Sequence, residues 1–386
     1  MSKKNITGLL LAWLVSLTAI SQDFSEYPHD TLLFQGQVSG WGLYNPDITP
    51  QVMGGGRFIP QANYEFHLRP GRLIDFEASV NAYGSTGANR IKATADGDIK
   101  PYRLWARYAS PQLELRGGLQ KINFGSASML RPLMWFDQID PRDPLQLTDG
   151  VWGMLGRYYF LNNMNIWAWA LYGNNDTKGW EVLETKKNTP EFGGRVQTPV
   201  PFGEAALSYH HRKVKGTGYG PSPADPGKTI LENRLGFDAR LDMVVGWWLE
   251  ASWTHKGDDL SVYTNQEIIN MGLDYTFGIG SGLTVIYEHL IAAYDQKAFS
   301  FLKPVYFSLV NLSYPIGLFD NLSAIVYYDW SNNKTYNFIN WNRQYNNFSF
   351  YLMGFLNPKS YKIPTQESTH NLYAGSGVHL MLVFNY

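Results

Sequence analysis

The chain contains no cysteine. This absence excludes a disulfide scaffold, a Cys-ligated zinc or iron–sulfur site and a thiol nucleophile. The chain also has no excess of positive or negative charge, since it contains 32 Lys and Arg and 33 Asp and Glu. A nucleic-acid-binding protein would show a basic excess. We therefore expect no cofactor and no nucleic-acid partner.

Long apolar runs are missing after the first residues. Lys3 and Lys4 precede an apolar stretch over Ile6–Ile20, which predicts a secretory signal peptide at residues 1–21. A single membrane anchor is the alternative. No later run approaches the ~18 apolar residues that a membrane-spanning helix needs. No linker divides the remaining sequence, so residues 22–386 are expected to form one domain.

What the chain does have is a high aromatic content, 15%, and a strict alternation of apolar and polar residues. Alternation with a period of two is typical of strands that have one apolar and one polar face. The segments that show it lie at residues 31–44, 57–69, 74–83, 103–108, 113–118, 150–161, 165–173, 191–200, 203–214, 233–244, 247–256, 268–279, 283–294, 305–316, 321–331, 335–344, 346–357 and 372–386.

The connections between these segments alternate between short turns and long polar loops. Residues 70–72 and 280–282 are examples of the turns, and 126–149 and 174–190 of the loops. Short turns on one side and long loops on the other are typical of a membrane barrel, in which a closed sheet pairs every main-chain group. The predicted fold class is all-β: a transmembrane antiparallel β-barrel of about 18 strands, with 16 as the main alternative.

The last segment is the most specific local signal. Its apolar residues alternate up to the terminal residue, and they are Val378, Leu380, Leu382, Phe384 and Tyr386. In this the chain resembles Gram-negative outer-membrane β-barrels, whose final strand ends in an aromatic residue that the barrel-assembly machinery reads. The resemblance implies location in the cell outer membrane, contact with outer-membrane lipid, and that machinery as a partner during biogenesis.

A narrower resemblance involves residues 117–125 and 139–143. These stretches look like the Gly-x-Gln, Trp-Gly and Asn-Pro-x-Asp motifs of alginate-export-like porins. Phe124 stands where that family usually has Trp, and Asp140 where it often has Asn. The resemblance implies a porin-like barrel, with alginate as a candidate substrate.

A barrel of about 18 strands encloses an aqueous lumen, so the polar face of its strands would line a pore. The candidate pore-lining residues are Arg57, Glu65, His67, Asp75, Glu77, Arg103, Trp105, Arg107, Glu114 and Arg116. These residues either select solutes or form an ion-pair network that only stiffens the wall.

Strand pairing predicts which of these side chains are neighbours. If Tyr108 lies opposite Leu113, then Arg107 faces Glu114 and Trp105 faces Arg116, which gathers three arginines on one wall. A three-residue turn at 70–72 would place His67 opposite Asp75 and Glu65 opposite Glu77.

The loop at 126–149 follows the fifth expected strand, the place of the loop that folds into the lumen in porins. Besides Asp149, its charged residues are the candidate constriction residues: Arg131, Asp137, Asp140, Arg142 and Asp143. An acidic loop facing an arginine wall would set a transverse field that filters ions. A plain extracellular loop is the alternative.

These features predict a porin-like outer-membrane channel for passive diffusion of small hydrophilic solutes, with a homo-oligomer left open. We expect no enzymatic activity, since no outward serine is predicted beside His211 or His289 to form a catalytic pair. The alternative is a surface receptor, a polysaccharide-export protein or an assembly protein that acts through long loops such as 174–190 and 215–232.

Overall fold

The computed structural model describes residues 30–88, 93–216, 228–360 and 372–386. The expected signal peptide at 1–21 and the centre of the 215–232 loop lie outside the described residues. No helix of the described residues is long and apolar enough to cross a membrane.

The described chain forms a single antiparallel sheet of 18 strands. The strands are β1 (Thr31–Tyr44), β2 (Val52–Arg69), β3 (Arg72–Ala88), β4 (Ala93–Ala109), β5 (Leu113–Gln120), β6 (Val151–Tyr159), β7 (Asn165–Leu171), β8 (Glu191–Val200), β9 (Gly203–Lys215), β10 (Thr229–Asp242), β11 (Gly246–Lys256), β12 (Asn265–Phe277), β13 (Leu283–Asp295), β14 (Val305–Ile316), β15 (Asp320–Asp329), β16 (Lys334–Tyr345), β17 (Phe348–Leu356) and β18 (Ser376–Asn385). A single 3₁₀ turn, η1 (Ser261–Tyr263), precedes β12.

The sheet closes on itself. Each strand pairs with its neighbours in sequence, and β1 pairs with both β2 and β18, where Gln37 lies opposite Asn385. Closure leaves no free sheet edge, which is what a sheet surrounded by hydrocarbon requires. The prediction of an 18-stranded all-β barrel is confirmed, and the alternative of 16 strands is wrong.

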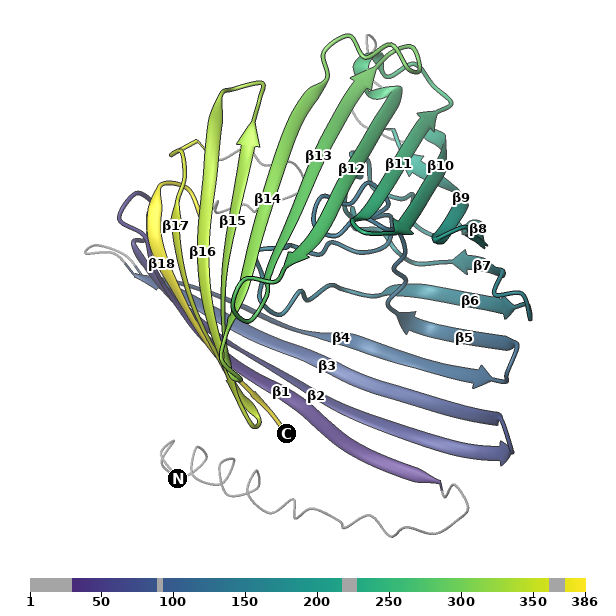
Figure 1. Cartoon of the computed structure of the whole chain (residues 1–386). Coiled ribbons are helices and arrows are strands. Elements are labelled where there is room, and N and C mark those ends of the chain that lie inside the picture. The colour runs from purple at the N-terminus through teal and green to yellow at the C-terminus, as the bar shows by residue number, and fades with distance from the viewer. Residues whose placement is uncertain (1–29, 89–92, 217–227, 361–371) are drawn as a thin grey trace.

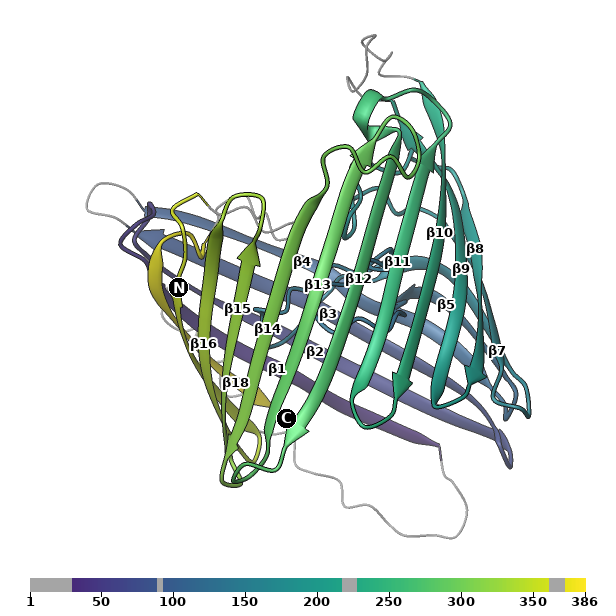
Figure 2. The same cartoon turned by 45° about the horizontal axis from the view of Figure 1, so that its top comes forward.

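Connections of two to five residues join the strands at one end of the barrel, and mostly longer connections join them at the other (Figures 1 and 2). Gly71 and Gly317 occupy two of the tight turns with a φ of +74° each, a conformation that glycine adopts without steric cost. The sequence pattern predicted this sorting of connections.

The two faces of the sheet differ as the alternation predicts. On β9, the outward Leu207 and Tyr209 are 65% and 39% exposed, whereas the inward His210 and Arg212 are fully buried. Exposed apolar side chains recur on the outer face of most strands, for example Leu115, Leu235 and Met271. An apolar surface this extensive would be a liability in water and is suited to a bilayer.

Apolar packing occurs inside the barrel, where inward segments meet the wall. Leu130 and Met134, from the segment between β5 and β6, pack with wall residues that include Leu290, Phe307 and Leu309. A second cluster joins Ile122, Phe124, Leu133, Trp135 and Phe136 of the same segment to Leu155 and Trp169 of the wall. The lumen is therefore partly filled by the chain itself.

Candidate functional site

The inner wall of β3–β6 carries a network of ion pairs. Arg107 binds Asp75 through two bonds, from Nε to Oδ1 (2.9 Å) and from Nη2 to Oδ2 (2.7 Å). Glu114 lies between three guanidinium groups, at 3.0 Å from Arg116, 3.6 Å from Arg157 and 3.9 Å from Arg107. Among the sequence-predicted charges of this wall, Arg107 and Arg116 are thus paired with Asp75 and Glu114.

The predicted register of β4 with β5 is wrong by two residues. Tyr108 lies opposite Leu115, so Arg107 faces Arg116 instead of Glu114, and Trp105 faces Gly118 instead of Arg116. The turn comprises residues 110–113, because the Ser110 N–H donates to the Leu113 carbonyl and the Leu113 N–H to the Ser110 hydroxyl. Arg116 still reaches Trp105, with its guanidinium 4.7 Å from the ring centroid.

The predicted pairing of β2 with β3 is also wrong. Arg69 lies opposite Arg72 across a two-residue turn, and a bulge between His67 and Arg69 then places His67 opposite Leu73. As a result Glu65 faces Asp75, and Glu77 faces Asn63. The opposed carboxylates are therefore Glu65 and Asp75 instead of the expected Glu65 and Glu77, and Arg107 pairs with Asp75.

Two wall cations have no carboxylate within salt-bridge distance among the described residues. The Arg103 Nη2 donates to the main-chain carbonyl of Thr148 at 2.9 Å, and its guanidinium lies 3.9 Å from the Tyr102 ring centroid. Arg57 lies 5.6 Å from the Tyr83 ring centroid. These two cations of the predicted wall make no direct ion pair, although Glu77 interacts electrostatically with Arg103 and Asp143 with Arg57.

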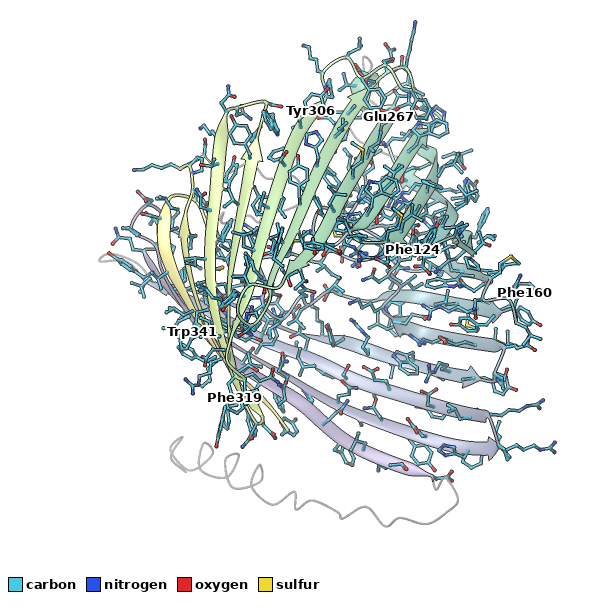
Figure 3. All side chains as sticks on the ribbon, in the orientation of Figure 1. Phe124, Phe160, Glu267, Tyr306, Phe319 and Trp341 are labelled. Carbon is cyan, nitrogen blue, oxygen red and sulfur yellow. The ribbon has the colours of Figure 1, made fainter. Side chains whose placement is uncertain are left out.

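The segment between β5 and β6, residues 121–150, folds into the barrel, as predicted for a constriction loop; we call it the inward loop. Figure 3 places Phe124, from its start, inside the barrel. Two glutamates of the facing wall hold the loop by its main chain. Glu250 accepts the N–H groups of Ala127 (2.8 Å) and Leu133 (2.6 Å).

Glu288 is the second anchor of the inward loop. Its carboxylate accepts the N–H groups of Ser128 (2.8 Å), Met129 (3.0 Å) and Leu130 (2.6 Å). Gly125 precedes these residues with a φ of +110°, and a Cβ there would lie 2.4 Å from the Glu250 carboxylate. Only glycine therefore fits at the point where the loop approaches this wall.

Indole groups fix the loop further. Trp135 donates its Nε1–H to the Ser252 hydroxyl of β11 at 3.0 Å. Trp180, from the connection between β7 and β8, donates to the main-chain carbonyl of Arg131 at 2.8 Å, and Gln266 of β12 donates to the Trp180 carbonyl at 2.9 Å. The inward loop is thus tied to the β11–β13 wall partly through a second inward segment.

The predicted acidic face of the inward loop is largely neutralised within the loop. Arg131 pairs with Asp137 at 2.9 Å, and Arg142 pairs with Asp140 at 2.6 Å. The loop therefore does not present the unpaired acidic surface that the transverse-field hypothesis assumed. Local pairing of residues close in sequence accounts for the difference.

Asp143 is the exception among the predicted loop residues. Its carboxylate accepts the main-chain N–H groups of Leu145 (3.0 Å) and Leu147 (3.3 Å). Burial raises the pKa of the Asp143 carboxyl above its ordinary value, against the lowering effect of those bonds. Asp143 and Arg57 line one cavity of about 230 Å³, together with Tyr373.

Sequence reasoning missed a second ionic cluster on the inner wall of β9 and β10. Arg212 and Arg234 both contact Glu232 (2.6 and 2.7 Å) and Glu181 (2.9 and 2.7 Å), and all four side chains are buried. The signal was available, since Arg212, Glu232 and Arg234 share the polar phase of neighbouring strands. Glu181, from the inward connection, could not be placed from its sequence position.

The outer wall requires a further correction. Ser308 does lie beside His289, with its hydroxyl 2.9 Å from the His Nδ1, contrary to the pairing inferred from sequence. The same hydroxyl accepts the Trp330 Nε1–H at 2.9 Å. Among the described residues no carboxylate bonds to the other His289 nitrogen, so the pair lacks the third member of a catalytic triad.

A closed 18-stranded barrel with a long segment folded into it is the architecture of Gram-negative outer-membrane porins, and this chain has a porin-like fold. OccAB4 from Acinetobacter baumannii is similar over 94% of this chain and 99% of that chain, with 9% identity and a TM-score of 0.56. OccD3 (OpdP) from Pseudomonas aeruginosa is similar over 92% of this chain and 91% of that chain, with 10% identity and a TM-score of 0.53.

At these identities the structural likeness shows the fold. No protein-family model matches the sequence, and no curated protein sequence matches it. The narrower resemblance to alginate-export-like porins therefore stays a prediction.

Proposed function

We propose that this protein is an outer-membrane channel through which small hydrophilic solutes diffuse passively. The observation that carries the proposal is the inward loop, held by Glu250 and Glu288 on one wall while charged side chains line the wall of β2–β6. Such an arrangement narrows a lumen and leaves charged side chains along the passage. In this proposal residues 1–21 are a signal peptide and residues 22–386 form a single barrel domain. Outer-membrane lipid surrounds the barrel, and the barrel-assembly machinery inserts it.

Selectivity, in this proposal, depends on the charges that remain unpaired. Arg107 and Arg116 have carboxylate partners, and within the described part of the chain Arg57 and Arg103 do not. An unneutralised cation attracts anions into a narrow passage. Arg57 and Arg103 are therefore proposed to favour small anions.

The test is single-channel recording from the full-length mature protein in a planar bilayer, with the reversal potential measured under a salt gradient. We expect stepwise conductance with a preference for anions, and a shift toward cations in Arg57→Gln and Arg103→Gln. Arg343→Gln is the matched control, since Arg343 lies at the end of β16 beside Asp320.

Two results would count against the proposal. If the reversal potential is unchanged in both variants, then Arg57 and Arg103 do not determine ion selectivity. If correctly folded barrels show no conductance, the proposal of a channel is contradicted. The alternative of a receptor, export or assembly protein that acts through its long loops is then favoured.

A further inference from the structure

Two carboxylates lie on the outer face of the barrel near its long-loop end. Glu267 of β12 is on the outward phase of its strand, and Asp295 ends β13. Asn265 lies opposite Asp295 and Glu267 opposite Ala293, so the two acids are diagonal neighbours on one face, about 7–8 Å apart between their Cα atoms. Figure 3 shows Glu267 near this end of the barrel.

Both acids are covered by the connection between β13 and β14, residues 296–304, which folds back over the outer wall; we call it the outer flap. Phe299 donates its main-chain N–H to the Glu267 Oε1 at 2.9 Å, and Leu302 donates to the Asp295 Oδ1 at 3.4 Å. The Phe299 ring also packs on Trp253, with a centroid distance of 5.3 Å. Glu267 is consequently only 1% exposed and Asp295 only 2%.

The outer flap has an unusual main chain for residues of this size. Phe299 has a φ of +58° and Phe301 a φ of +47°, in the left-handed region that bulky residues rarely adopt. Such conformations cost on the order of 1–3 kcal/mol each and persist where surrounding contacts enforce them. The two N–H bonds to carboxylates are contacts of that kind.

Each carboxylate keeps one oxygen without a partner. The Glu267 Oε2 and the Asp295 Oδ2 are buried and accept no hydrogen bond. Neither acid has a Lys, Arg or His within 4 Å among the described residues. Two buried carboxylates with no cation beside them repel each other, and a cation bound between them would relieve that repulsion.

We propose that the free oxygens of Glu267 and Asp295 bind a divalent cation of the calcium class, which fastens the outer flap to the barrel wall. The donors are all oxygens, which hard cations prefer, and Ca²⁺ takes roughly 6–8 of them in irregular arrangements. The proposal does not depend on whether the barrel conducts.

Terbium provides a direct probe, because Tb³⁺ replaces Ca²⁺ and luminesces when a nearby indole absorbs light. Trp253 lies directly opposite Glu267 in the register of β11 and β12, within reach of the site. The full-length mature barrel, folded in detergent, is titrated with Tb³⁺ and then with Ca²⁺ or Mg²⁺. We expect saturation near one equivalent, displacement by Ca²⁺, and affinity at least about tenfold weaker in Glu267→Gln and Asp295→Asn.

Asp258→Asn is the matched control, since Asp258 is a carboxylate of the same rim that pairs with Lys228; it should bind Tb³⁺ as the wild type does. A second readout is the temperature at which the barrel loses its compact gel mobility, with Ca²⁺ and with a chelator. Ca²⁺ should raise this temperature in the wild type and not in Glu267→Gln.

The alternative of a shared proton gives opposite results. Glu267→Gln would then leave Tb³⁺ luminescence unchanged, the chelator would not lower the unfolding temperature of the wild type, and an amide in place of a protonated carboxyl would be tolerated or stabilising. Any of these three outcomes overturns the cation site.

Discussion

Replacement of Glu288 by glutamine should loosen the inward loop while leaving the barrel intact. The Glu288 carboxylate accepts three main-chain N–H groups, from Ser128, Met129 and Leu130, and glutamine has the same shape without the charge. Its amide N–H₂ would also face one of these donors and leave it unpaired.

The magnitude follows from the number of bonds. A hydrogen bond to a charged group contributes about 1.5–3 kcal/mol, and a neutral acceptor about half of that. Three bonds to Glu288 therefore lose about 2–4 kcal/mol in Glu288→Gln. Since 1.4 kcal/mol is a tenfold change in an equilibrium constant, the undocked loop should become roughly a hundredfold more populated.

Single-channel current noise measures this population. Glu288→Gln should show frequent excursions to a higher conductance that are absent from the wild type. Glu204→Gln, an exposed carboxylate of β9 next to the turn at 201–202, should leave the trace unchanged. If Glu288→Gln gives the same mean conductance and noise as the wild type, then the carboxylate does not hold the loop, and the reasoning from these three bonds fails.

Three other predictions follow from the charges and faces described above. Burial raises the pKa of the Asp143 carboxyl, so acidification from about pH 7 toward about pH 4 should protonate it before ordinary aspartates. The loss of this negative charge should shift the reversal potential further toward anion selectivity. In Asp143→Asn this shift should be absent. Asp238→Asn should lower the unfolding temperature in a gel-mobility assay. The substitution leaves the buried Arg195 guanidinium, 2.5 Å from Asp238 in the wild type, without a carboxylate partner, at a cost of about 3–5 kcal/mol. An unchanged unfolding temperature would contradict this. Leu207→Lys, on the outer face, should reduce folding into lipid vesicles by about 2–4 kcal/mol, whereas the inward Gln197→Lys should fold normally; equal folding yields would argue against the assigned faces.

The strands were predictable because burial on one face imposes alternation along each of them. The segments 203–214 and 283–294 correspond to β9 (Gly203–Lys215) and β13 (Leu283–Asp295). Strand number and the sorting of connections follow from the same pattern. Lipid on one side and polar contacts on the other leave little freedom in the choice of face.

Register was less predictable, because it depends on hydrogen bonds within the turns. The β4–β5 turn moved by one residue since Ser110 and Leu113 bond to each other, and the β2–β3 hairpin gained a bulge beside His67. Each change altered which charges are neighbours while leaving them on the inner face.

The anchors of the inward loop could not be predicted at all. Glu250 and Glu288 were not singled out from the sequence, because their partners are main-chain groups more than a hundred residues earlier in the chain. A sequence pattern shows which side chains share a face, but it does not show where the backbone of a loop will come to rest. The burial of Glu267 and Asp295 could not be predicted either, because the outer flap that covers them is a connection without a periodic pattern.

The anchoring of the inward loop has a consequence for how such a channel can diversify. Glu250 and Glu288 accept peptide N–H groups, which every residue except proline offers, so these bonds set no side-chain requirement, whereas Leu130 and Leu133 also pack in the apolar clusters of the lumen. Substitutions elsewhere on the loop surface can alter its charge or bulk while the loop stays in place. The bonds that hold the loop are thus separate from the loop surface that contacts the solute. Side chains on that surface can change during evolution without loss of the bonds to Glu250 and Glu288.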